Sequence, residues 1–207
     1  IINNEINSVS DNPVILDNGK VAYSGHFHAE PVAQALDFIA IAMAELGAIS
    51  ERRTYFFMKG ISGRITPFLT IQPGVESGYM MAQVTASTLV SENKTLAHPA
   101  SIDSLPTSGG QEDQVSMAPW AGLKLLQIQK NVRQIMAIEL LVASAASTLF
   151  HAGLKPGKGT TPILKHIQQL VPFHKGDRVL SGEIHTLSDM IKKGKIISFV
   201  KQVINLE

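Results

Sequence analysis

The chain has 207 residues, which is enough for one ordinary domain with a substantial core. Its charged fraction of 17% is lower than the roughly 25% of typical soluble domains and indicates much buried surface. The formal net charge of +1 gives no sign of a nucleic-acid partner, and the absence of cysteine excludes disulfides and thiolate metal sites.

The first predicted element is a small β-hairpin close to the N-terminus. Asp11-Asn12-Pro13 is a turn signal, and the apolar runs 14–16 and 21–23 lie on either side of Asp17-Asn18-Gly19. No other stretch of the sequence has a convincing strand pattern.

Two long helices are predicted next. Pro31 suits the first turn of a helix that we expect to run to about Phe57, because the N–H that proline lacks would have no partner inside the helix there. Few positions of this helix are polar, so we expect it to be buried on most sides. A connector rich in glycine and proline covers 60–74, and a second helix is predicted over 75–97.

A third helix is predicted from about Glu112 to Phe150. Its polar residues recur at spacings of three and four and predict one solvent-facing side, whereas apolar residues at similar spacings predict a buried side. The solvent-facing set is Lys124, Gln127, Asn131 and Gln134, and the buried set is Leu125, Ile128, Val132 and Ile135. Beyond Ile135 polar residues become rare, so we expect 135–150 to enter the middle of a bundle or of an oligomer.

These elements predict an all-α fold, a long-helix bundle with a small β-hairpin and loop region near the N-terminus. After a turn at 155–159, short amphipathic pieces are predicted near 162–171 and 186–204. We therefore divide the chain into a helical bundle part, 1–154, and a part with short C-terminal helices, 155–207. No uninterrupted apolar stretch approaches the roughly 18–20 residues that span a bilayer, so no membrane contact is expected.

The N-terminus of the chain predicts that it is one portion of a longer protein. Ile1-Ile2-Asn3-Asn4-Glu5 has neither an initiator methionine nor the basic and apolar regions of a signal peptide. We expect the remainder of the protein to precede it.

Two histidines and a glutamate suggest a metal site, but only weakly. His26, His28 and Glu30 could lie on one side of an extended segment. We favour a hydrogen-bonded or exposed loop before a helix and predict no metal. The sequence also lacks the His-Glu-x-x-His, Gly-x-Ser-x-Gly and phosphate-loop patterns.

Glu112 occupies an unusual position for an acid. In the predicted layout it stands at the N-terminus of the third helix, just after two glycines. Free N–H groups and the helix dipole favour an ionised carboxylate there, which suits recognition of a cationic or N–H-bearing ligand better than general acid catalysis. The alternative interpretation is an acid that only stabilises the first helical turn.

Several segments together resemble the aromatic amino acid ammonia-lyase family, and its histidine ammonia-lyase members most closely. The resemblance extends over about residues 5–145. The matching segments are 6–13 (INSVSDNP), 25–31 (GHFHAEP), 49–53 (ISERR), 77–85 (SGYMMAQVT), 91–99 (SENKTLAHP) and 103–117 (DSLPTSGGQEDQVSM).

This resemblance implies a C-terminal portion of a cytoplasmic enzyme that eliminates ammonia from L-histidine to give urocanate. It also implies a homotetramer of long helices with active sites shared between subunits, in which this portion contributes to the oligomer core and pairs with the N-terminal part of the same protein. The family's electrophile, a methylidene-imidazolone, forms from an Ala-Ser-Gly triplet. None of the serine-glycine pairs here follows an alanine, so we expect the electrophile and the catalytic groups outside this chain, and the chain alone to be inactive.

The resemblance further implies three substrate-binding residues, Phe27, Met80 and Glu112. Phe27 matches a position near the substrate and the electrophile, and the other two match the side-chain pocket. Phenylalanine-type relatives usually have Lys and Gln where this chain has Met80 and Glu112. A carboxylate can accept a hydrogen bond from an imidazole N–H, whereas a phenyl ring offers no donor and would leave a buried anion unpaired.

Two departures from the family pattern leave further functions open. The family usually has Asn at the position of His26, and Ala-Asn at Gly109-Gly110. Both departures lie next to proposed site residues and allow a lyase or a 2,3-aminomutase acting on another aromatic amino acid. The sequence is also compatible with a lyase-like scaffold without chemistry and, least favoured, with a metal-dependent hydrolase at His26 and His28.

Overall fold

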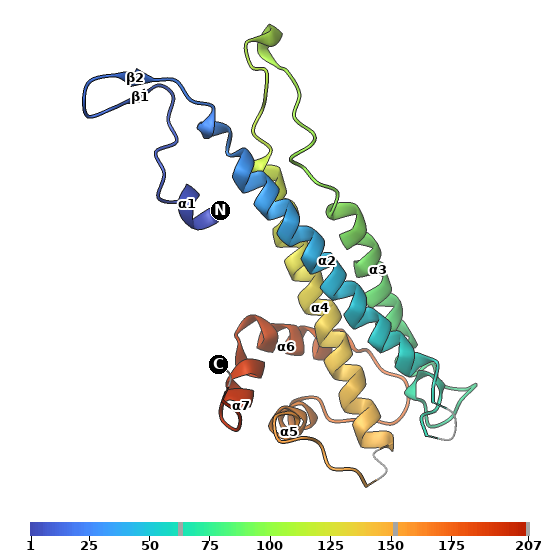
Figure 1. Cartoon of the computed structure of the whole chain (residues 1–207). Coiled ribbons are helices and arrows are strands. Elements are labelled where there is room, and N and C mark those ends of the chain that lie inside the picture. The colour runs from blue at the N-terminus through green and yellow to red at the C-terminus, as the bar shows by residue number, and fades with distance from the viewer. Residues whose placement is uncertain (62–63, 151–152, 206–207) are drawn as a thin grey trace. The chain divides into compact units, whose positions relative to one another are not determined.

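A computed structural model describes residues 1–61, 64–150 and 153–205 of the chain (Figure 1). Helices dominate, and a two-stranded sheet lies near the N-terminus, which confirms the predicted fold class. The Ser62-Gly63 pair, one of the serine-glycine pairs, lies outside the described residues. The elements in chain order are α1 (Ile2–Glu5), β1 (Val14–Ile15), β2 (Val21–Ala22), η1 (His26–His28), α2 (Glu30–Met58), η2 (Pro67–Leu69), α3 (Met80–Leu96), η3 (Ser108–Gly110), α4 (Ala118–Phe150), α5 (Thr160–Leu170), α6 (Ser181–Lys192) and α7 (Lys195–Lys201).

Contacts within the chain define two compact units. The first unit comprises Ile1–Glu45 and Asn93–Gln129, and the second comprises Leu46–Glu92 and Lys130–Glu207. The three long helices α2, α3 and α4 therefore each contribute residues to both units.

The hairpin of the first unit forms as predicted. β1 and β2 pair antiparallel, with Val14 opposite Ala22 and Ile15 opposite Val21. Gly19 adopts a φ of +75° in the turn, a conformation that glycine reaches without steric cost.

Helix α2 matches its predicted span, but α3 and α4 begin later than predicted. Residues 75–79 form a turn instead of helix, because Gly78 has a φ of +55° and a Cβ there would lie 2.4 Å from the carbonyl oxygen of Phe68. Residues 112–117 are not helical either, and α4 begins at Ala118. Pro119 then occupies the first turn of α4, where its missing N–H costs no helical hydrogen bond.

The predicted solvent-facing side of α4 is wrong at two of its four positions, since Lys124 is 5% exposed and Asn131 only 2%. In the first unit, the Nζ atom of Lys124 donates to the carbonyl of His98 and lies 3.8 Å from Oδ1 of Asp37. In the second unit, Asn131 donates to Glu92 at 3.0 Å. Residue spacing showed that these polar groups share a side, but not that partners cover it.

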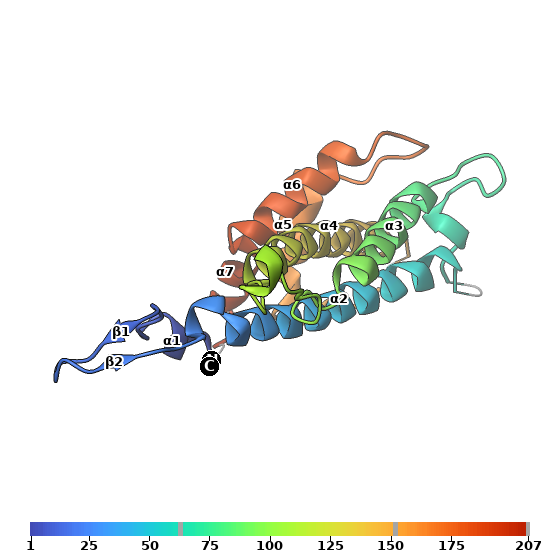
Figure 2. The ribbon, with the colours of Figure 1, turned by 90° about the horizontal axis from the view of Figure 1, so that it is seen from above.

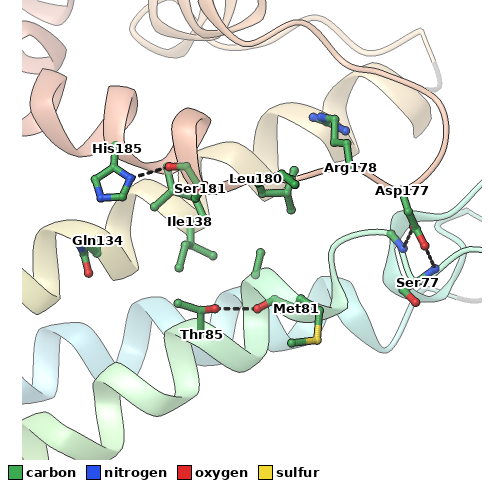
Figure 3. A pocket seen from close by; sticks show the side chains of 14 residues that line it. Ser77, Met81, Thr85, Gln134, Ile138, Asp177, Arg178, Leu180, Ser181 and His185 are labelled. Carbon is green, nitrogen blue, oxygen red and sulfur yellow. Dashed lines mark hydrogen bonds between the residues drawn. The ribbon is translucent and has the colours of Figure 1, made fainter.

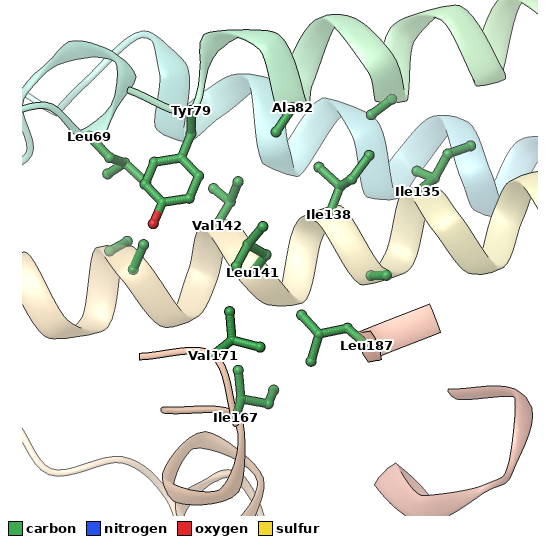
Figure 4. Close-up of a cluster of buried hydrophobic side chains, with 14 of the residues drawn as sticks. Leu69, Tyr79, Ala82, Ile135, Ile138, Leu141, Val142, Ile167, Val171 and Leu187 are labelled. Atoms are coloured by element: carbon green, nitrogen blue, oxygen red, sulfur yellow. The ribbon is translucent and has the colours of Figure 1, made fainter. Parts of the chain in front are cut away.

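The core of the second unit is built around the C-terminal half of α4. Ile135, Ile138 and Val142 are fully buried there. Figure 4 shows Ala82 of α3 and Leu187 of α6 in the same cluster of apolar side chains. The expectation that 135–150 enters the middle of a bundle is confirmed for this chain by its own packing.

Polar contacts join α2 to α3 and α4 inside the second unit. Ser50 donates to Glu139 at 2.5 Å, and Arg53 also binds Glu139 through two nitrogens. Glu51 accepts hydrogen bonds from Gln83 at 2.7 Å and from Ser87 at 2.8 Å. The segment 49–53 thus connects three helices.

The C-terminal part has three short helices where two were predicted. Gly194 adopts a φ of +68° and separates α6 from α7, as a left-handed glycine commonly does at a helix end. Figure 2 shows α5, α6 and α7 gathered close to α4.

Two helical segments, His26–Met58 and Ala118–Phe150, are long and apolar enough to cross a membrane by length and composition. Short polar interruptions hid this property when only uninterrupted apolar runs were considered. In the second segment half of the most apolar window is buried inside the protein, which is what the core helix of a bundle shows.

Candidate functional site

Phe27 lies in the short 3-10 helix η1, which leads into α2. Its side chain is 44% exposed, and its ring lies 4.2 Å from the ring of His28, measured between centroids. Ala29 follows with a φ of +55°, a left-handed conformation that turns the chain into α2. Phe27 therefore lies at a bend of the chain and is partly accessible to solvent.

Glu112 does not lie at a helix N-terminus, contrary to the prediction. Its backbone pairs with Thr107, whose N–H donates to the carbonyl of Glu112 at 2.8 Å, across a turn that contains Gly109 and Gly110. These glycines have φ values of +66° and +89°. The helix dipole consequently does not account for this acid, and the glycines serve to close the turn behind it.

The turn that carries Glu112 is linked to the element after Phe27 within the first unit. Nε2 of Gln114 lies 3.5 Å from Oε2 of Glu30, the first residue of α2. Glu112 is exposed, and in the described part of the chain no hydrogen bond or ion pair engages its carboxylate. The acid is therefore available to a ligand.

Met80 is the first residue of α3 and is half-buried in the second unit. The residues before it are held by the segment before α6. The carboxylate of Asp177 accepts hydrogen bonds from the N–H groups of Ser77 at 3.0 Å and Gly78 at 2.8 Å. Arg178 donates to the hydroxyl of Tyr79 at 3.2 Å.

Charges and burial set the pKa values around this turn. The N–H groups of Ser77 and Gly78 lower the pKa of Asp177 below its ordinary value. Burial raises the pKa of Tyr79, although Arg178 opposes that rise. An ionised Asp177 and a neutral Tyr79 are therefore the forms present near neutral pH.

An apolar cavity of about 490 Å³ adjoins this turn in the second unit. Figure 3 shows Met81 and Thr85 on α3, Ile138 on α4 and His185 on α6 around it. Met80 does not line this cavity.

The two histidines of the predicted loop have local partners. Nε2 of His26 lies 3.0 Å from Oε2 of Glu5, and the ring of His28 lies against Phe27. Across residues 1–61, 64–150 and 153–205, no three histidine, cysteine or acidic side chains are grouped so that they could hold a metal ion.

The sequence did not point to Asp177 or Arg178 as neighbours of Met80. They lie 97 and 98 residues away along the chain, and no local motif marks them. The signal that could have indicated the turn is Gly78, a glycine inside the helix predicted over 75–97, because glycine weakens a helix and favours a turn.

The three long helices and the segment around Met80 lie in the part of the chain that defines the class of protein. Residues 1–169 match the aromatic amino acid lyase family, and the chain belongs to that family. The resemblance deduced from the sequence is thereby confirmed.

Individual relatives narrow this class. The chain is 45% identical over 192 residues to histidine ammonia-lyase of Shewanella pealeana, a match that covers 92% of this chain and 38% of the relative. The crystal structure of histidine ammonia-lyase from Trypanosoma cruzi superposes with a TM-score of 0.89 at 37% identity, covering 98% of this chain and 40% of that one. Tyrosine aminomutase from Streptomyces globisporus gives a TM-score of 0.89 at 27% identity, over 98% and 39% of the two chains.

The chain thus spans about 38–40% of the length of these relatives. It is homologous to histidine ammonia-lyase, a carbon-nitrogen lyase. Of the two long apolar helices, α4 is a core helix of this chain. The prediction that α2 is buried on most sides is wrong, because only 22% of its most apolar window is buried within the chain.

Proposed function

We propose that this chain is the C-terminal part of a histidine ammonia-lyase. In this reaction the bond from Cα to the amino nitrogen of L-histidine breaks, one β-proton leaves, and a Cα–Cβ double bond forms, giving urocanate and ammonia. The observation that carries the proposal is the 45% identity to a histidine ammonia-lyase over 92% of the chain.

The substrate pocket would include Phe27, Met80 and Glu112. The exposed ring of Phe27 offers an aromatic face to the substrate, and Met80 offers an adaptable apolar side chain. The free carboxylate of Glu112 can accept a hydrogen bond from an imidazole N–H, and such charge-assisted bonds contribute about 1.5–3 kcal/mol.

The family uses a methylidene-imidazolone cofactor, which supplies an electrophile to the reaction. The chain contains no Ala-Ser-Gly triplet, so its own residues do not fit formation of that group. We place the electrophile and the base in a preceding part of the same protein. Residues of this chain would bind and orient the substrate side chain.

Assembly into a cytoplasmic homotetramer is part of the proposal. Helix α2 exposes large apolar side chains in both of its portions, among them Phe38 at 75% in the first unit and Phe56 at 57% in the second. Exposed large apolar side chains that recur along one helix, here also Ile39, Ile41, Leu46 and Ile49, commonly mark an interface. Other copies of the protein, or its preceding part, would cover them.

A 2,3-aminomutase is the second candidate, because tyrosine aminomutase structures superpose on the chain about as well as the lyase structure does. A mutase returns the ammonia to the β-carbon instead of releasing it. A lyase-derived scaffold without chemistry is the third candidate.

Ammonia and product analysis with the complete gene product that contains this chain tests the proposal. L-Histidine should yield urocanate and ammonia in equal amounts, and the 207-residue chain alone should yield neither. Formation of a β-amino acid would show that the protein is an aminomutase and not a lyase. Turnover of tyrosine or phenylalanine instead of histidine would show that the substrate is another aromatic amino acid. No turnover of any of the three would favour the scaffold without chemistry.

A further inference from the structure

Two consecutive residues of the segment between α5 and α6 bind the turn immediately before Met80. The carboxylate of Asp177 receives the N–H groups of Ser77 and Gly78, one on each oxygen, at 3.0 and 2.8 Å. Figure 3 shows Asp177 directed at this turn. Both donors lie ahead of the first helical residue of α3, so Asp177 acts as a cap supplied by a distant segment.

Arg178 fixes the next residue of the turn. One of its nitrogens donates to the hydroxyl of Tyr79 at 3.2 Å, and two nitrogens bind the carboxylate of Glu183 at 2.9 and 3.0 Å. Tyr79 is only 3% exposed, so its ring cannot move without opening the core. Glu183 on α6 therefore anchors Arg178, and Arg178 anchors Tyr79.

The backbone of the turn has little freedom to adjust in another way. The N–H of Tyr79 donates to the carbonyl of Phe68 at 3.0 Å. Gly78 packs so closely on the same carbonyl that a Cβ would lie 2.4 Å from its oxygen. With Ser77, Gly78 and Tyr79 all held, the direction in which Met80 leaves the turn is fixed.

We propose that Asp177 and Arg178 are positioning residues for Met80 and thereby determine the selectivity for the substrate side chain. This role rests on the proposed function, in which Met80 lines the side-chain pocket. In this role the two residues act on the pocket through the turn 77–79, which they hold by hydrogen bonds to Ser77, Gly78 and Tyr79. Loss of either would let Met80 shift at the start of α3, so that the pocket fits its substrate less well.

Substitutions in the complete gene product test this role. Asp177→Asn removes the charge and one acceptor, and Asp177→Glu keeps the carboxylate on a longer side chain. Arg178→Lys keeps the charge but not the geometry that binds Glu183 and Tyr79 together. Asp189→Asn on α6 is the matched control, because Asp189 is exposed and its carboxylate lies 3.9 Å from the ammonium of the exposed Lys193.

Hydrogen exchange and kinetics are measured on the same samples. In Asp177→Asn, amide exchange should become at least about tenfold faster at residues 77–80, the change expected when a charge-assisted hydrogen bond is lost. The KM for histidine should rise about tenfold with a smaller change in kcat, and the preference for histidine over phenylalanine should narrow. Asp177→Glu should recover part of this loss, and Asp189→Asn should match the unmodified protein.

The outcomes separate this inference from the proposed function. If the unmodified gene product turns over histidine and Asp177→Asn keeps both its KM and its selectivity, the positioning role is wrong. A uniform fall in kcat for every substrate, with unchanged selectivity, would also overturn it. If the unmodified gene product turns over no amino acid, the proposed function fails, and the role of Asp177 in selectivity fails with it even where exchange at 77–80 responds.

Discussion

Glu51 of α2 and Gln83 of α3 are joined by a hydrogen bond of 2.7 Å, from Nε2 of Gln83 to Oε1 of Glu51. Glu51 is 2% exposed, and its carboxylate also receives Ser87 and the guanidinium of neighbouring Arg52. Gln83 and Ser87 both lie on α3, so each would lose its acceptor if the two helices slid, and this buried acid therefore holds α2 and α3 in one register.

Glu51→Gln should destabilise the protein by about 1.5–3 kcal/mol, because an amide nitrogen would then face donors that need an acceptor. Chemical denaturation of the purified protein measures this loss. Glu45→Gln is the matched control, since Glu45 lies on the same helix and is exposed. Equal stability of the two variants would show that the Glu51 network contributes nothing specific.

Acid should weaken the fold through the same carboxylate. Burial raises the pKa of Glu51, but the hydrogen bonds from Gln83, Ser87 and Arg52 outweigh burial and leave the pKa below its ordinary value of 4.5. A carboxylate with a lower pKa in the folded state stabilises the protein above the unfolded pKa, and this contribution is lost as the pH falls through the folded pKa.

The melting temperature should therefore fall as the pH is lowered below 4.5. The fall should be shallower in Glu51→Gln, which has no proton to gain at this position. Thermal melts of both proteins between about pH 3 and pH 6 measure the difference. Parallel curves would assign the acid sensitivity to other groups.

The buried pair of Asp37 and Lys124 should behave as a unit. Within the described residues, Asp37→Ala leaves the buried Lys124 ammonium with the His98 carbonyl as its partner and removes the acceptor of the Ser101 N–H, and it should cost about 3–5 kcal/mol. Replacing both residues, Asp37→Leu with Lys124→Met, should cost less than Asp37→Ala, because no charge stays buried and the remaining cost is that of the unpaired Ser101 N–H and His98 carbonyl.

A double-mutant cycle monitored by denaturation measures the coupling of this pair. Lys130→Met on the same helix is the control for the lysine substitution, since Lys130 is exposed. Additive effects of the two single substitutions would mean that Asp37 and Lys124 contribute independently.

Glu112→Gln tests the acid of the proposed pocket. The turnover of histidine should fall about 10- to 100-fold in kcat/KM, because a charge-assisted hydrogen bond to imidazole is lost, and stability should not change. Asp113→Asn is the matched control, as the neighbouring exposed acid. An unchanged histidine rate in Glu112→Gln would exclude the role in recognition.

Phe27→Ala should lower activity through poorer placement of the substrate. Because the side chain is 44% exposed and contacts His28, its removal should change stability by less than about 1 kcal/mol. Steady-state kinetics with histidine, alongside a thermal melt, separate the two effects. Full activity of the Phe27→Ala variant would exclude Phe27 as a substrate-binding residue.

The predicted site is only partly accounted for by local sequence. Motifs singled out Phe27 and Glu112, and the structure links their segments through Gln114 and Glu30. The helical position assigned to Glu112 was wrong, because Gly109 and Gly110 close a turn that periodicity does not detect. Substrate contact by Phe27, Met80 and Glu112 stays a prediction.

The amino-acid sequence by itself determined the family, the hairpin, the span of α2 and the burial of residues 135–150. These features depend on residue type at short spacing, which is where propensity and periodicity act. Only the tertiary structure decided that Lys124 and Asn131 are buried and that Asp177 binds the turn before Met80. Contacts of this kind join residues tens of positions apart. They arise from the packing of whole helices, which local residue patterns do not predict.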